Sequence, residues 1–159
     1  MKQFKKMMAM LFVAATMTFG ACSDDEKETT TPDNIAGTQW VGNVSNSYSL
    51  QGITMNFDMK FNMKFTDNEN GQMATDFSLE VPTIPSANQN QSDTFDFNYT
   101  FDGTTLTISE NGTAVSTLTY NKSNDTFTMP IPNADEEMAE LGVSLGELLG
   151  TTQVVFHKK

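Results

Sequence analysis

The sequence contains one cysteine, one histidine, one tryptophan and no arginine in 159 residues. A single cysteine excludes a disulfide framework, and one histidine with one cysteine excludes the zinc sites built from about four such ligands. All nine basic residues are lysines, against twenty acidic residues, so the formal net charge is −11. Because a chain this acidic repels phosphate backbones, nucleic acid is excluded as a partner. The length predicts a single domain.

Long apolar runs are also missing, apart from a short one at the N-terminus. Basic residues within 1–6 precede an apolar stretch from Met7 to Phe19, which small residues and Cys22 follow. This order is typical of a secretory signal peptide. The stretch is shorter than the roughly 18 apolar residues of a membrane-spanning helix. We therefore expect residues 1–21 to be a signal peptide that is removed on export, which leaves six lysines against the twenty acidic residues.

Cys22 directly follows Gly20 and Ala21, and this arrangement resembles the lipobox of bacterial lipoproteins, with Phe19 where leucine is usual. The resemblance implies that the Cys22 sulfur is diacylated and that Cys22 becomes the first residue of the mature chain. Two or three acyl chains, such as palmitate, anchor a protein firmly, whereas one chain holds it only marginally. We expect a protein attached to a membrane through N-terminal acyl chains that does not span it.

The lipidated Cys22 opens an acidic, threonine-rich stretch, residues 22–36, which predicts a flexible linker. Ser23 to Glu26 resemble the acidic export tag by which some Gram-negative anaerobes send lipoproteins to the outer face of the outer membrane. The same residues can also be only the start of a solvated linker. We expect an outer-membrane lipoprotein of a Gram-negative bacterium, displayed on the cell surface, with a periplasm-facing position as the alternative.

Residues 37–159 alternate between apolar and polar side chains nearly throughout. The clearest run is 55–66, where Met and Phe occupy every second position, and such a period of two predicts a half-buried strand. Turn sequences at 67–71, 102–103 and 111–112 separate similar runs. With an opening strand near 38–47 and a closing strand near 151–157, we expect eight strands.

Two segments depart from the short hairpins. Pro82 and Pro85 interrupt the pairing and predict a polar loop over 86–93. Pro132 to Glu137 have the capping residue and acidic first turn of a helix, and leucines follow at helical spacing. We expect one short helix or two helical turns before the last strand, with a packed loop as the alternative because Gly142 and Gly146 lower helix propensity.

Sequential antiparallel strands joined by short hairpins favour an all-β fold, an eight-stranded antiparallel up-and-down β-barrel with a short helical insertion before the last strand. A sandwich of the Greek-key kind is the alternative, and it needs long crossover connections.

The domain start from Gly37 to Gly42, the hairpin-linked strands and the closing residues Val155 to Lys158 together resemble the lipocalin-like, or calycin-like, domains of small bacterial lipoproteins. In that family a Gly-x-Trp sequence places the tryptophan as a plug at the closed end of the barrel, under an arginine. Here the spacing is Gly-x-x-Trp, and the chain has no arginine. The resemblance implies a structural role for Trp40 as the plug of the barrel.

Methionine and phenylalanine alternate on the predicted inward faces. Thioethers and aromatic rings make an adaptable apolar lining, which would suit an apolar or amphipathic ligand. The alternative is a barrel filled by its own side chains, since eight strands enclose only about that much space. The candidate lining residues are Met55, Phe57, Met59, Phe61, Met63, Phe65, Met73, Phe77, Phe95, Phe97, Tyr99, Phe101 and Met129.

No catalytic, metal-binding or cofactor-binding pattern is present. Methionines four residues apart on one strand are about 13 Å apart, too far to share a Cu(I) ion without neighbouring strands. The turn 67–71 lacks the closing glutamate of a calcium loop. His157 is better explained as an exposed residue at the end of a strand than as a catalytic base, since no nucleophile motif accompanies it. We expect a protein that is not an enzyme and has no metal or cofactor.

Two functions remain open. One is the binding of a small apolar or amphipathic ligand in the barrel. The other is a filled barrel that contacts an envelope or host protein through the loops 86–93 and 133–150, with protease inhibition as a variant of this second function. An apolar void of several hundred Å³ would distinguish the first from the second. We expect a monomer in either case.

Overall fold

The computed structural model describes residues 34–138 and 142–159. The predicted signal peptide 1–21, Cys22 and most of the predicted linker 22–36 therefore lie outside the described residues. The folded part reaches back to Ile35, which is only 2 % exposed. The backbone N–H of Gly37 then donates to the carbonyl of Phe65, and this bond ties the entering chain to the barrel.

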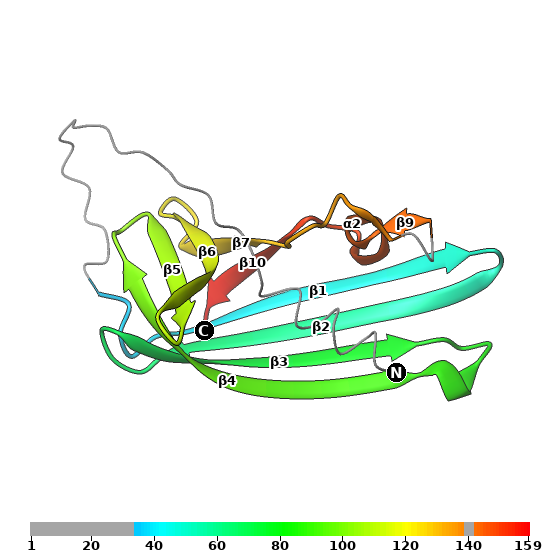
Figure 1. Ribbon diagram of the computed structural model, residues 1–159, viewed down its shortest axis with the longest axis horizontal. Helices are drawn as coiled ribbons and strands as arrows, with labels where there is room; N and C mark the ends of the chain where they lie inside the picture. Colours follow the sequence, from blue (N-terminus) through cyan, green and yellow to red (C-terminus); the bar gives the residue numbers. More distant parts are fainter. Residues whose placement is uncertain (1–33, 139–141) are drawn as a thin grey trace.

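Eight strands close into a barrel in the order β1-β10-β7-β6-β5-β4-β3-β2, and every neighbouring pair is antiparallel (Figure 1). This confirms the predicted all-β up-and-down barrel. A small hairpin and one short helix are inserted before the last strand. The elements are β1 (Gln39–Leu50), β2 (Ile53–Phe65), β3 (Asn70–Glu80), the 3-10 helix η1 (Pro85–Ala87), β4 (Gln89–Phe101), β5 (Thr105–Glu110), β6 (Thr113–Asn121), β7 (Thr126–Pro130), β8 (Glu137–Met138), β9 (Val143–Ser144), α2 (Leu145–Leu149) and β10 (Gln153–Lys158).

The strands differ greatly in length. β1 to β4 contain 11 to 13 residues each, whereas β5, β7 and β10 contain 5 or 6. Figure 1 shows the four long strands running across the molecule and β5 to β7 gathered at one end. β10 pairs with β1 only over Trp40–Gly42, and β5 pairs with β4 only over Asn98–Phe101. All eight strands therefore meet at one end, which we call the closed end. Beyond it, β1 to β4 continue as a four-stranded sheet, the sheet extension (43–50, 53–60, 76–80 and 89–92).

The predicted turns are confirmed at 67–71, 102–103 and 111–112, each of which joins two neighbouring strands. The predicted polar loop over 86–93 is wrong in its extent, because β4 already begins at Gln89. The side chain of Asn88 accepts a hydrogen bond from the N–H of Val81 at 2.7 Å and closes the connection after a single 3-10 turn. The polar residues that follow pair with β3 through their backbone, while their side chains remain largely in solvent.

The predicted short helix before the last strand is confirmed, but its predicted start at Pro132 to Glu137 is wrong. Turns and the start of β8 occupy those residues, and α2 begins after Ser144. Ser144 accepts from the N–H of Glu147, and the Glu147 carboxylate accepts in return from the N–H of Ser144, so a complete capping box fixes the start of the helix. α2 packs against β1, where the Asn46 side chain donates to the carbonyl of Leu148 at 2.9 Å.

Aromatic rings fill the closed end around Trp40, which is 1 % exposed. Its ring lies 4.6 Å from that of Phe127 and 6.3 Å from that of Tyr120, both in edge-to-face geometry. The indole N–H donates to the Thr38 hydroxyl at 2.8 Å, so the one polar atom of this ring is satisfied. Edge-to-face pairs contribute about 0.5–1.5 kcal/mol each beyond the apolar area they bury. The stability of the barrel is therefore concentrated at this end.

Tyr120 provides a test of this packing. Its hydroxyl donates to the carboxylate of Asp125 at 2.7 Å, and burial together with that carboxylate raises the pKa of Tyr120 to about 12. The phenol of Tyr120 ionises less readily in the folded than in the unfolded state. The protonated hydroxyl therefore stabilises the folded state fully below about pH 10, and this stabilisation is lost as the pH rises towards 12. We predict that Tyr120→Phe lowers the free energy of unfolding by about 1.5 kcal/mol at neutral pH. The difference from the wild type should shrink above pH 10.

Urea unfolding followed by Trp40 fluorescence measures both effects. Tyr48→Phe is the matched control, because the Tyr48 hydroxyl makes no hydrogen bond within the described residues. A constant difference between the wild type and Tyr120→Phe up to pH 12 would contradict the role given to the hydroxyl of Tyr120.

Candidate functional site

The candidate lining residues all lie on the inner face of the barrel or of the sheet extension. The registers between β1, β2, β3 and β4 are continuous, so inward-facing residues of one strand pair with inward-facing residues of the next. Met63 pairs with Met73, and Met59 pairs with Phe77. Three of the residues, Met55, Phe95 and Phe101, are half-buried. The buried ones are Phe57, Met59, Phe61, Met63, Phe65, Met73, Phe77, Phe97, Tyr99 and Met129.

At the closed end these side chains pack against one another. The Phe65 ring lies 4.7 Å from that of Tyr99 and 5.9 Å from that of Phe97. Met63, Phe65 and Met73 have no exposed surface at all, so no water-sized void touches them. This part of the predicted lining is a close-packed core, as in most protein interiors.

Along the inner face of the sheet extension, burial decreases with distance from the closed end. Phe57 and Leu79 keep 8 % of their surface exposed, and Tyr48 and Met55 further along are only half-buried. The inner face of β4 turns polar in the same direction, where the exposed Asp93 faces Thr75. The open end of the barrel therefore has an apolar floor and a polar border on β4.

A hollow of about 740 Å³ lies in the barrel wall where β1 and β10 separate. Its volume falls in the range of small-molecule sites, about 300–1,000 Å³. Residues of β1, β2, β3 and β10, most of them outward-facing, line it together with the end of α2 and the connection that follows. These are Val41, Gly42, Asn43, Val44, Ser45, Lys60, Phe61, Asn62, Ala74, Asp76, Leu149, Gly150, Thr151, Gln153, Val155 and His157.

The hollow exists because the ladder between β1 and β10 ends after Gly42 and Phe156. The N–H of Lys159 donates to the carbonyl of Gln39, which fixes the odd-numbered residues of β1 as those whose backbone groups point towards β10. Asn43 and Ser45 therefore direct N–H and C=O groups into the hollow, where no described strand pairs with them. On β10, the backbone N–H and C=O groups of Val155 likewise point into the hollow. The hollow thus offers backbone donors and acceptors beside apolar side chains.

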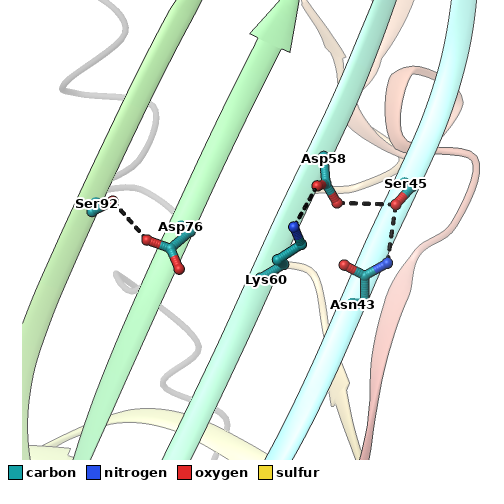
Figure 2. A network of polar contacts seen from close by, with 6 residues as sticks. All are labelled: Asn43, Ser45, Asp58, Lys60, Asp76 and Ser92. Carbon is teal, nitrogen blue, oxygen red and sulfur yellow. Dashed lines mark hydrogen bonds and ion pairs between the residues drawn. The ribbon is translucent and has the colours of Figure 1, made fainter.

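Polar side chains cross the outer face of the long strands next to the hollow (Figure 2). The Asn43 side-chain amide and the Ser45 hydroxyl are hydrogen-bonded at 3.0 Å, and the Ser45 hydroxyl also lies 3.0 Å from the Asp58 carboxylate. Lys60 forms an ion pair with Asp58 at 3.1 Å. These contacts hold the side chains of Asn43, Ser45 and Lys60 in place where β1 and β2 line the hollow, although an exposed ion pair adds little stability by itself.

Asp76 on β3 is a further charged residue of the lining, directly across from Lys60 in the register of β2 and β3. Asp76 accepts a hydrogen bond from the Ser92 hydroxyl at 2.6 Å (Figure 2) and forms no ion pair with any described residue. On the side of the hollow towards β10, Val41 and Val155 form an apolar strip, and Val41 is 37 % exposed. An amphipathic molecule could place its apolar side on this strip and its polar groups against Asn43, Ser45 or Asp76.

Of the predicted lining residues only Phe61 borders this hollow. Gly42, Val44 and Leu149 are buried as well, whereas most of the other lining residues face outward in the alternating pattern, so the sequence marks those as solvent-exposed. The one sequence signal of a hollow is a pair of apolar residues at outward positions of the first and last strands, Val41 and Val155, together with Gly42 next to Val41. The sequence alone did not single out this combination.

Within residues 34–138 and 142–159, no three His, Cys, Asp or Glu side chains gather as a metal site would require. No helix in the same part of the chain is long and apolar enough to cross a membrane. Comparisons with protein families, with characterised proteins and with solved structures found no match for this chain. The chemistry of the site therefore has to be argued from its own residues.

Gly42 marks the point at which the ladder ends, and its lack of a side chain has a steric reason. A methyl group at this position would lie 2.8 Å from Val154 Cγ1 and 3.3 Å from the Phe156 ring, and both side chains are fully buried. We predict that Gly42→Ala lowers the free energy of unfolding by about 1–3 kcal/mol, the usual cost of overpacking a core. Urea unfolding provides the measurement. The neighbouring variant Asn43→Ala, at an exposed position, should change stability by much less, and equal losses in the two variants would contradict this explanation.

Proposed function

We propose that this protein is a lipid-anchored, non-enzymatic binding module that holds a small amphipathic molecule in the hollow between β1 and β10. The observation that carries the proposal is the hollow itself, about 740 Å³ with a mixed apolar and polar lining, beside a closed end that its own side chains fill. Binding sites for small molecules commonly combine an apolar surface with a few oriented polar groups.

The lining favours a molecule with an apolar face and several hydrogen-bonding groups. Val41 and Val155 would contact the apolar face. The backbone groups of Asn43 and Ser45 would pair with hydroxyl, amide or amine groups, and Asp76 favours a donor or a cation over an anion. Lys60 does not alter this preference greatly, because its charge is matched by Asp58.

A lipocalin-like relationship is part of the proposal, and the surroundings of Trp40 support it. The up-and-down barrel closes over this tryptophan, as the family pattern implies. The chain lacks the arginine of that pattern, yet the ammonium group of Lys158 lies 5.9 Å from the centre of the Trp40 ring. Lys158 pairs with Trp40 across β1 and β10 and so supplies a cation above the ring from the last strand.

The membrane anchor is proposed from the sequence alone. Cys22 after Gly20 and Ala21, with a preceding signal peptide over 1–21, supports diacylation of the cysteine in a Gram-negative outer membrane. The acidic residues from Ser23 to Glu26 support display on the cell surface. About a dozen residues between Cys22 and Ile35 then act as the tether of the barrel, which stays soluble through its many carboxylates.

A bulky residue on the floor of the hollow tests the proposed site. Ala74 is half-buried, faces outward and lines the hollow, so Ala74→Trp should fill it without entering the core. We predict that native mass spectrometry of the protein purified from its own cells detects a bound small molecule in the wild type and none in Ala74→Trp. Ala114→Trp, at an exposed position of β6 away from the hollow, is the matched control and should retain the molecule.

Extraction with organic solvent gives a second measurement on the wild type. Removing the molecule should lower the melting temperature, and adding the extract back should restore it, because a ligand of the folded state stabilises that state by mass action. The same extract should not stabilise Ala74→Trp. A molecule retained by Ala74→Trp but lost from Met55→Trp would instead place the ligand inside the barrel at its open end, and absence of any bound molecule in the wild type would contradict a small-molecule function.

The anchor has a separate test. We predict that Cys22→Ser abolishes incorporation of a clickable palmitate analogue and moves the protein from the membrane to the soluble fraction of lysed cells. Ser23→Ala, one residue away, should leave both properties unchanged. Labelling that persists in Cys22→Ser would contradict lipidation at this residue.

A further inference from the structure

The edge of β4 that faces away from β3 is unpaired over much of its length. β5 pairs only with Asn98–Phe101, and no described strand pairs with that edge of β4 before Asn98. In Figure 1, β4 runs along the lower border of the sheet, while β5 and β6 stand at one end of it. A sheet edge of this kind is a template for a further strand.

Two hydrogen bonds determine which residues present their backbone there. The N–H of Tyr99 donates to the carbonyl of Glu69, and the N–H of Asp102 donates to the carbonyl of Thr105. In an antiparallel ladder such bonds alternate, so odd residues of β4 bond to β3 and even residues point towards the β5 side. The even residues before Asn98 therefore form what we call the open edge: Asn90, Ser92, Thr94 and Asp96.

The side chains of the open edge leave these backbone groups accessible. All four residues are exposed. The Ser92 hydroxyl bonds back to Asp76 at 2.6 Å (Figure 2), and the Asp96 carboxylate accepts from Gln72 at 2.8 Å, so both side chains lean over β3 and away from the edge. The register of β4 with β3 is continuous, without a bulge, and β4 contains no proline. The usual devices that block an edge strand are therefore missing, apart from charge.

The charge near the open edge has one sign. Residues 65–121 contain eight carboxylate side chains and no lysine, arginine or histidine. Asp93 and Asp96 lie on β4 itself, and Asp76 and Glu80 lie on the neighbouring strand β3. A second copy of this chain paired antiparallel at this edge would bring like carboxylates to neighbouring positions across the pair, which is unfavourable. A strand with lysine or arginine side chains would instead meet opposite charges.

From these observations we propose that the open edge of β4 binds an extended, basic segment of another protein as an added antiparallel strand. The backbone groups of Asn90, Ser92, Thr94 and Asp96 supply the hydrogen bonds, and Asp93 and Asp96 select for cationic side chains. This surface is the outer border of β4, whereas the hollow opens between β1 and β10 at the other border of the four long strands and reaches as far as Ala74 and Asp76 on β3.

Amide hydrogen exchange of the full chain in a neutral detergent tests the pairing directly. The probe is a short peptide of alternating lysine and threonine, and its counterpart has glutamate in place of lysine. We expect the lysine peptide to slow exchange at Asn90, Ser92, Thr94 and Asp96 at least about tenfold, since formation of one hydrogen bond protects each amide. Exchange at the odd residues, which already bond to β3, should change little, and the glutamate peptide should have no effect.

A proline substitution separates backbone pairing from simple charge attraction. Thr94→Pro removes an N–H that points to the open edge and leaves the ladder with β3 intact, whereas Thr94→Ala keeps the N–H. Affinity for the lysine peptide should fall about tenfold or more in Thr94→Pro and stay near the wild-type value in Thr94→Ala. If Thr94→Pro does not fold, the double variant Asp93→Asn with Asp96→Asn serves instead. It should weaken binding and reduce its dependence on salt, while Glu110→Gln, at the end of β5, should do neither.

Protection by the lysine peptide that maps to residues other than the open edge would overturn the proposal, as would full affinity in Thr94→Pro. Protection of the open edge that rises with protein concentration in the absence of peptide would identify a second copy as the occupant and would equally overturn it. The small-molecule site keeps its own test, which is the loss of the bound molecule in Ala74→Trp, so the two proposals fail on different readouts.

Discussion

The architecture depends on how few residues close the barrel. β1 and β10 share three residue pairs, Trp40 to Gly42 with Phe156 to Lys158, and β4 and β5 share four. A closed barrel needs every strand to have two partners, and here that condition holds only at one end. The strands after β4 are too short to accompany β1 to β4 along their whole length. The remaining residues of the long strands therefore form an open sheet with unpaired backbone on both borders, and each surface proposed for function is part of such a border.

Such a design requires the closed end to stabilise the extension. Trp40, Phe65 and Phe127 are almost completely inaccessible, and burial of each large side chain contributes about 1.5–3 kcal/mol. Rings from β1, β2, β4, β6 and β7 meet there, so this cluster connects the short strands to the long ones. The sheet extension gains less stability from apolar burial, since its inner side chains are partly exposed and, of its four strands, α2 packs only against β1. Local opening should therefore begin in the extension, far from Trp40.

The local sequence pattern was sufficient to predict most strands, because a period of two and a turn sequence are properties of neighbouring residues. The run from Met55 to Phe65 and the turns at 102–103 and 111–112 are examples. The start of β4 was missed because Gln89 to Asp93 are polar, and only pairing with β3 makes them a strand. The start of α2 was missed because the acidic residues before Met138 resemble a first helical turn, whereas the capping box lies at Ser144 and Glu147. The hollow could not be predicted, because it depends on where the β1 and β10 ladder ends, and outward residues such as Asn43 and Ser45 carry no sign of that.

The two borders differ in what they can bind, although both result from the same unequal strand lengths. In the lining of the hollow few backbone groups remain available, because the Thr151 hydroxyl already bonds to both the N–H and the carbonyl of Gln153, and α2 packs against β1, where the Asn46 side chain donates to the carbonyl of Leu148. Of the residues that line the hollow, Asn43, Ser45 and Val155 present unpaired backbone groups, and they lie on two separate strands. Along β4, four alternate residues offer their N–H and carbonyl groups in an unbroken row. A compact molecule with a few polar groups suits the first border and an extended polypeptide suits the second, so the two proposed sites differ in chemistry although one short closure leaves both borders open.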